Sequence, residues 1–134
     1  MTKSELKNYR IEKFEFINKT TGIKRIELTH KYSYNVGYAG DNTCRGEFTA
    51  NIFDKETPDS FHINITVVGI FNTVPGREKE FLHLETYDML FPYVKALVAT
   101  MTAASGVAPV NIPYIDISDK NIYRMEIPHK PDNN

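Results

Sequence analysis

The chain has 134 residues, of which 41% are hydrophobic and 25% charged, and it carries a net charge of −1. This length is enough to bury the core of one domain, and the balanced charge excludes a general attraction to nucleic acid or to an anionic membrane surface. The single cysteine, Cys44, cannot form an internal disulfide, and the first ten residues are polar, without a signal-peptide apolar run. We therefore expect one cytoplasmic domain over residues 1–134, ending in a disordered tail at 128–134.

Four segments alternate apolar and polar residues in the way that is typical of β-strands. In the first, Tyr9–Asn18, the apolar row changes phase near Glu12–Lys13, which predicts a β-bulge. The second, Lys24–Val36, has His30 in its apolar row, where we expect a buried core histidine. The other two strands are predicted at Glu47–Phe53 and Phe61–Phe71.

The same alternation predicts which face of the sheet each side chain occupies. The outer face is expected to be polar and mixed in sign, with Arg25, Glu27, Lys31, Glu47, Thr49, Asn51, His62 and Asn64. Val68 and Ile70 continue the outer row of the fourth strand as apolar residues. They predict either an exposed apolar patch or packing under a neighbouring loop.

A long helix is predicted at Asp88–Ser105. Asp88 is placed to cap its first turn, Pro92 falls at about the end of that turn, and Gly106 supplies the residue that ends helices. Apolar residues recur on this helix at helical spacing and form the predicted oligomer interface: Leu90, Val94, Leu97, Val98 and Met101. Lys95 is the only charge between the cap and Gly106, so the helix lacks the charged back of a surface helix.

A helix of this kind is expected to be covered on one side by its own sheet and on the other by a second copy of the chain. The alternative is a half-exposed helix with a small face rich in alanine and threonine. The segment is too short and too interrupted for the ~20-residue apolar run of a membrane span. After it, Val107–Ile117 contains Pro109 and Pro113 and is expected to be extended, and Asn121–Ile127 predicts a last short strand. The fold class is α+β, a four-stranded antiparallel sheet with one long helix packed on one face.

No group of residues indicates catalysis, a metal site or a bound cofactor. The four histidines, His30, His62, His83 and His129, lack paired-ligand spacing on a shared element. His83 and Glu85, two residues apart before the helix, would share one face of a strand, but a solvated loop is the interpretation that we favour. Cys44 lies in a glycine-rich turn with no histidine nearby in sequence, so it is a weak candidate nucleophile. The chain is therefore expected to be a binding protein and not an enzyme.

Three motifs, taken in order, resemble the SecB family of protein-export chaperones. Ile63–Phe71 (INITVVGIF) is similar to the family's strand that ends in Gly-Ile-Phe. Leu90–Val98 (LFPYVKALV) is similar to the family's Leu-Phe-Pro-Tyr helix start. Gly106–Ile117 (GVAPVNIPYIDI) resembles the loop that opens Gly-x-x-Pro, with different internal spacing. Before Glu47 the similarity is one of strand pattern alone.

The resemblance implies that protomers pair edge to edge and that two dimers stack through their helices into a homotetramer. It also implies an ATP-independent holdase in protein transport, which captures unfolded or newly made polypeptides in apolar grooves. For this chain we expect client contacts from apolar residues that the sequence leaves uncovered: Val68, Ile70, Tyr114 and Ile115.

Three departures from the family pattern bear on this expectation. The segment Ser118–Asn134 contains two prolines and the strand-like NIYRMEI, so the family's C-terminal second helix is expected to be missing. Lys19–Gly22 indicates a tight turn in place of the family's long crossover between its first two strands. His62 and Asn64 stand where the motor ATPase SecA docks in the family, so docking of SecA is not expected. Two alternatives therefore stay open, a dedicated chaperone of one partner, such as a toxin–antitoxin or secretion protein, and an oligomeric scaffold without a groove.

Overall fold

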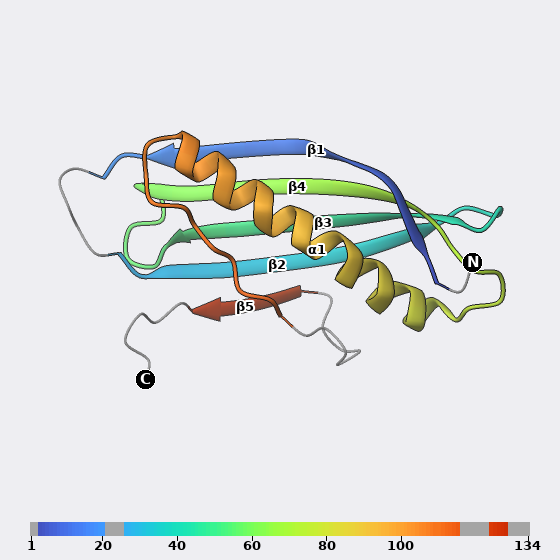
Figure 1. Ribbon diagram of the computed structural model, residues 1–134. Coiled ribbons are helices and arrows are strands. Elements are labelled where there is room, and N and C mark those ends of the chain that lie inside the picture. The colour runs from blue at the N-terminus through green and yellow to red at the C-terminus, as the bar shows by residue number, and fades with distance from the viewer. Residues whose placement is uncertain (1–2, 21–25, 116–123, 129–134) are drawn as a thin grey trace.

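The computed structural model describes residues 3–20, 26–115 and 124–128. The elements in chain order are β1 (Glu5–Asn18), β2 (Leu28–Tyr38), β3 (Thr43–Asp54), β4 (Phe61–Asn72), α1 (Lys79–Ala104) and β5 (Arg124–Pro128). All strand pairs are antiparallel, in the order β1-β4-β3-β2-β5. Figure 1 shows α1 lying diagonally across one face of the sheet. The α+β class and the four predicted strands are confirmed, and β5 extends the sheet in the segment that predicts a last short strand.

The pattern of burial follows the predicted faces of the sheet. Alternate residues of β3 and β4, such as Phe48, Ile52 and Ile65, are fully buried on the side of α1. The residues between them, such as Thr49 and Asn51, face outward and are partly exposed. The register of β1 against β4 shifts between Ile11 and Lys13, so the predicted bulge is confirmed. The core therefore lies in a single layer between the sheet and α1.

The connection from β1 to β2 corrects the expectation of a tight turn at Lys19–Gly22. β1 lies at one edge of the sheet, and β4 and β3 separate it from β2, so the chain crosses the sheet between residues 18 and 28. Three strand spacings amount to ~14 Å, and nine extended residues reach roughly 30 Å. The Lys19 N–H donates to Ser60 O at 2.6 Å at the start of this crossover, of which residues 21–25 lie outside the described part of the chain. A local turn signal carries no information about which strand the next segment joins, so the prediction was wrong.

Helix α1 begins at Lys79, one residue after the N-cap position at Glu78, and not at Asp88. Pro92 lies inside the helix and points to solvent, and the buried residues Leu82 and Tyr87 extend the core face over the additional turns. Burial of such side chains offsets the cost of about 3 kcal/mol for a proline in a helix interior. The end of the helix is as predicted, because Gly106 has a φ of 93°.

The segment after α1 returns over the sheet beside the helix (Figure 1). It is extended as far as Ile115, which agrees with the proline-based prediction. Hydroxyl groups fix its backbone, since Tyr87 Oη donates to Ile115 O at 2.9 Å and Tyr32 Oη donates to Pro113 O at 3.3 Å. Within this segment, Ile112 is fully buried.

No second helix follows α1 in the residues that the structure describes. The segment 124–128 instead forms β5 on the outer edge of β2, so Pro128 ends a strand, and the predicted tail at 129–134 lies outside the described residues. Among the described residues, no helix combines the length and the apolar character that a membrane span requires.

Candidate functional site

An aromatic cluster fills the space between α1 and the sheet and reaches the surface at Tyr114. Phe48 of β3 stacks on Tyr87 with ring centres 5.7 Å apart, and Phe91 meets the edge of Tyr114 at 5.3 Å. The Tyr114 side chain is 54% exposed, and its hydroxyl donates to Asp88 Oδ1 at 2.7 Å. A large, half-exposed ring is thus held in one position by buried neighbours. We call the exposed ring of Tyr114, supported by the buried rings of Tyr87 and Phe91, the Tyr114 surface.

A second exposed aromatic contact lies on the β1 side of α1. Tyr9 of β1 and Tyr93 of α1 pack with ring centres 4.7 Å apart, and they are 40% and 42% exposed. Sequence reasoning missed this pair, because the two residues lie far apart in the chain and only the helix position brings them together. The two flanks of α1 therefore each present ordered aromatic surface.

The four predicted client contacts do not form one site. Val68 and Ile70 lie on the outer face of β4, whereas Tyr114 and Ile115 lie on the helix side of the sheet. Val68 is 1% exposed and Ile115 is 5% exposed, so neither is uncovered as the sequence suggests. Ile70 is partly exposed beside the turn between β2 and β3. Only Tyr114 of the four presents a large apolar surface.

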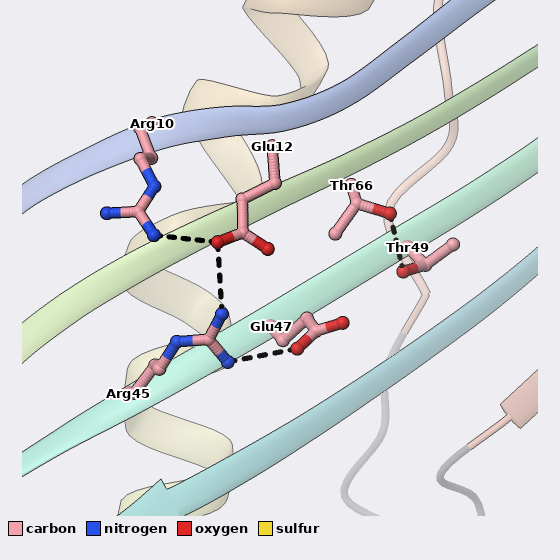
Figure 2. Close-up of polar contacts among 6 residues, drawn as sticks. All are labelled: Arg10, Glu12, Arg45, Glu47, Thr49 and Thr66. Atoms are coloured by element: carbon pink, nitrogen blue, oxygen red, sulfur yellow. Dashed lines mark hydrogen bonds and ion pairs between the residues drawn. The ribbon is translucent and has the colours of Figure 1, made fainter.

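An ion-pair network explains why Val68 is buried. Glu12 of β1 accepts from Arg10 at 2.7 Å and from Arg45 of β3 at 3.2 Å, and Arg45 also pairs with Glu47 at 3.0 Å. Figure 2 shows that the contact between Glu12 and Arg45 spans β4. The register places Val68 between Arg10 and Glu47, directly under these side chains. The outer face is mixed in sign, as predicted, and its charges cover Val68 without a loop.

The predicted oligomer residues fall into two groups. Leu90, Val94 and Val98 are fully buried against the protomer's own sheet, so a second copy cannot reach them. Leu97 and Met101 are partly exposed at the border of that face. The exposed positions of α1 after Asp88 are Pro92, Tyr93, Lys95, Ala96, Thr100, Ala103 and Ala104. Apart from Tyr93, the outward side of the helix after Asp88 therefore carries small uncharged residues and one lysine, and a contact with a second copy through α1 would use it.

The histidines show no arrangement for catalysis in the described residues. His30 is 1% exposed and meets the ring of Tyr32 edge-on, so it is a buried core histidine as predicted. His83 and Glu85 lie in α1 and not in a strand or loop, so the spacing of two residues points them to different sides of the helix. The described residues contain no group of three histidine, cysteine or acidic side chains that could hold a metal.

Cys44 is a buried residue of β3 and not part of a turn, which corrects the sequence-based placement. It is 3% exposed, and burial raises the pKa of its thiol from the ordinary value of 9.0 to about 11, with a smaller contribution from the charge of Glu85. A thiol with this pKa is almost entirely protonated at neutral pH, so it is a poor nucleophile.

This burial makes a pH-dependent contribution to stability. Between about pH 9 and pH 11 the unfolded chain releases the Cys44 proton while the native state keeps it, so the free energy of unfolding falls as pH rises. Between about pH 8 and pH 10, we expect wild type to lose about 1 kcal/mol more than Cys44→Ala in urea denaturation. The comparison removes the contribution of buried Tyr32 and Tyr34, whose pKa values burial also raises. Equal losses of unfolding free energy in wild type and Cys44→Ala would contradict the raised pKa of the Cys44 thiol.

An antiparallel sheet with a crossover between its first two strands and one long helix over one face is a fold similar to that of a SecB-like chaperone. In sequence, the chain is similar to SecB proteins. A protein-export protein SecB of Orientia tsutsugamushi is 32% identical over 86 residues, which is 59% of this chain and 52% of that protein. An uncharacterized protein of Methanocaldococcus jannaschii is 30% identical over 60 residues, 42% of this chain and 39% of that protein.

The solved structures show the fold over a longer stretch than the sequence does. A SecB-like chaperone of Mycobacterium tuberculosis, in complex with a ChAD peptide from the HigA1 antitoxin, matches with a TM-score of 0.66 at 11% identity. The match covers 84% of this chain and 91% of that chain. No protein-family model matches the sequence. The chain spans about half the length of the curated SecB relatives that it matches.

Proposed function

We propose that this protein is an ATP-independent holdase chaperone of the cytoplasm, which binds unfolded or newly made polypeptides. The observation that carries the proposal is the Tyr114 surface on a SecB-like fold, where rigid packing keeps an aromatic ring exposed. Aromatic rings bind apolar segments without reading a particular sequence, because every apolar side chain buries area against them. The proposal assigns binding, and no reaction, to this surface.

The energetics of such a surface favour weak contacts used many times. A client segment that buries ~400 Å² of apolar surface gains roughly 10 kcal/mol. Association and ordering cost about 4–15 kcal/mol, so a single surface binds weakly. Useful affinity then requires one client to contact several copies of the surface at once. Assembly into an oligomer is therefore part of the proposed mechanism.

The outward side of α1 is the proposed contact between copies. Pro92, Ala96 and Ala103 lie on it and are exposed, and Lys95 is its only charge after Asp88. Small uncharged residues allow two helices to approach closely without burying a charge. A homotetramer would bring four Tyr114 surfaces into one particle.

A second candidate function is a dedicated chaperone of one partner. The M. tuberculosis structure supports it, since that SecB-like chaperone holds a peptide from a single antitoxin. Both functions use the same surface, and they differ in whether unrelated unfolded proteins bind. Delivery of clients to SecA is not part of either proposal, because the outer face of the sheet is balanced in charge.

Replacing Tyr114 by serine is expected to weaken client binding by roughly tenfold. An aromatic side chain has 150–250 Å² of surface, and Tyr114 leaves 54% of its surface exposed for a client. Covering most of this area gains ~2 kcal/mol, of which part is lost to imperfect packing. The measurement is fluorescence anisotropy with a labelled, permanently unfolded protein.

Two variants serve as matched controls for this substitution. Phe81→Ser removes an aromatic ring that is 43% exposed in the first turn of α1, and it should leave the affinity unchanged. Tyr114→Phe keeps the ring and loses the hydrogen bond to Asp88, so a change of less than about twofold is expected. If Tyr114→Ser and Phe81→Ser both bind the client as tightly as wild type, the Tyr114 surface is not the client site.

A further inference from the structure

The outer edge of β2 is occupied by a strand from the same chain. β5 pairs antiparallel with β2 from Thr29 to Ser33, and its five residues cover the first half of an 11-residue strand. The ladder on the other side of β2 continues to Tyr38, where it pairs with Cys44 of β3. Figure 1 shows β5 lying alongside β2 at the edge of the sheet. The edge of β2 therefore extends beyond the strand that lies on it.

β5 is attached to the fold through this one ladder. Among the described helices and strands, it packs only on β2, and α1 does not cover it. A short strand held by one ladder gains a few net hydrogen bonds of modest strength while its backbone loses freedom, so its pairing is close to balanced. Such a strand exchanges readily with another extended segment that offers the same hydrogen bonds.

The register defines what the edge accepts. Met125 lies opposite Tyr32 and Ile127 lies opposite His30, and the side chains of Tyr32 and His30 are buried on the helix side of the sheet. Glu126 lies opposite Lys31, which is exposed on the outer face. The sequence of β5, which this edge holds, thus alternates apolar and polar residues. Many segments that form strands in folded proteins have this pattern, and unfolding exposes them.

We propose that the edge of β2 is a strand-acceptor site for extended polypeptide segments, and that β5 occupies it in competition with the client. This inference rests on the proposed chaperone function and adds regulation to it. The Tyr114 surface is continuous with the site, because Tyr32 of β2 donates its hydroxyl to the backbone of Pro113, next to Tyr114. A client strand on β2 would therefore run beside the exposed ring, and β5 lowers the affinity of the free protein until a client displaces it.

A reversible disulfide tests the competition in the full-length chain. Lys31 and Glu126 are opposite each other, and facing residues of antiparallel strands have Cα atoms about 4.5–5.5 Å apart, within the range that a disulfide bridges. In Lys31→Cys/Glu126→Cys, oxidation locks β5 onto β2. We expect the oxidised variant to bind fluorescein-labelled, reduced and carboxymethylated α-lactalbumin at least tenfold more weakly than the same variant after reduction.

Wild type under the same oxidant and reductant is the control, since its single cysteine, Cys44, is buried. A second variant acts in the opposite direction: Glu126→Pro removes a backbone N–H from the middle of β5, and it should bind the client at least threefold more tightly than wild type. If locking and unlocking leave affinity unchanged while wild type binds the client, the strand-acceptor inference is wrong and the chaperone function stands. If no form binds an unfolded protein, both proposals fail.

Discussion

Replacing Gly46 by alanine is expected to lower the free energy of unfolding by about 3 kcal/mol. A Cβ at this position would collide with the hydroxyl of Tyr34 and lie 2.9 Å from its Cζ. The Tyr34 ring cannot move aside, because it is 2% exposed and packs on Tyr87 at 5.4 Å. Displacing it would also break the buried hydrogen bond to Thr86 Oγ1, which is 2.6 Å long. The substitution thus combines overpacking with the loss of a buried polar contact.

Urea denaturation checks this prediction against Gly40→Ala, where an added Cβ meets nothing within 4 Å. That control should change the free energy of unfolding by less than about 0.5 kcal/mol. In a Tyr34→Phe background, which removes the hydroxyl, Gly46→Ala should be less damaging than in wild type. Equal stabilities of the Gly46 and Gly40 variants would contradict the packing described for Tyr34.

Placing glutamate at Ala96 and Ala103 is expected to break the proposed contact between copies through α1 and so to lower the mass of the particle. Both residues are exposed on the outward side of α1 and are seven positions, about two turns, apart. In a symmetric helix contact, each substitution would enter the interface twice, and an unpaired carboxylate buried there costs several kcal/mol. The fold of the protomer should survive, because neither alanine contributes to the buried face of α1.

Light scattering coupled to size exclusion measures the outcome, with circular dichroism as the check on folding. The matched control is Asn8→Glu/Asn35→Glu, which adds the same charge at exposed positions of β1 and β2. The control should keep the mass of wild type, and the helix variant should fall to half of that mass or less, as an edge-paired dimer or the 15.4-kDa protomer. An unchanged oligomer in the helix variant would show that copies meet through another surface.

Local patterns in the sequence predicted those features of the fold that local interactions determine. The alternation of β3 and β4 gave the correct faces, the phase change near Glu12 gave the bulge, and Gly106 gave the end of α1. The predicted start of α1 at Asp88 was wrong, because Asp88 and Pro92 together have the sequence pattern of a helix N-terminus. The turns before them are helical because Leu82 and Tyr87 pack on a sheet that the local sequence does not reveal.

The site was harder to predict than the fold, because it depends on contacts between distant segments. Tyr114 was identified as uncovered, and it is. Val68 was also expected to be uncovered, but the ion pair between Glu12 and Arg45 covers it, and no local pattern couples two strands across a third. Ile115 is covered because Tyr87 binds the backbone of the segment after α1. The crossover after β1 was missed for the same reason, since the order of strands in a sheet depends on contacts between distant segments.

The central claim is that this chain binds unfolded polypeptides without ATP. The most direct test dilutes an unfolded protein into buffer with and without the chain, at equal subunit concentrations, and follows light scattering together with the mass of any complex. The account predicts that scattering is suppressed without nucleotide and that the client co-elutes with an oligomer of the chain. An intact oligomer that neither suppresses aggregation nor retains any client would contradict the general holdase, and a pull-down from native cells would then decide between a dedicated partner and a scaffold.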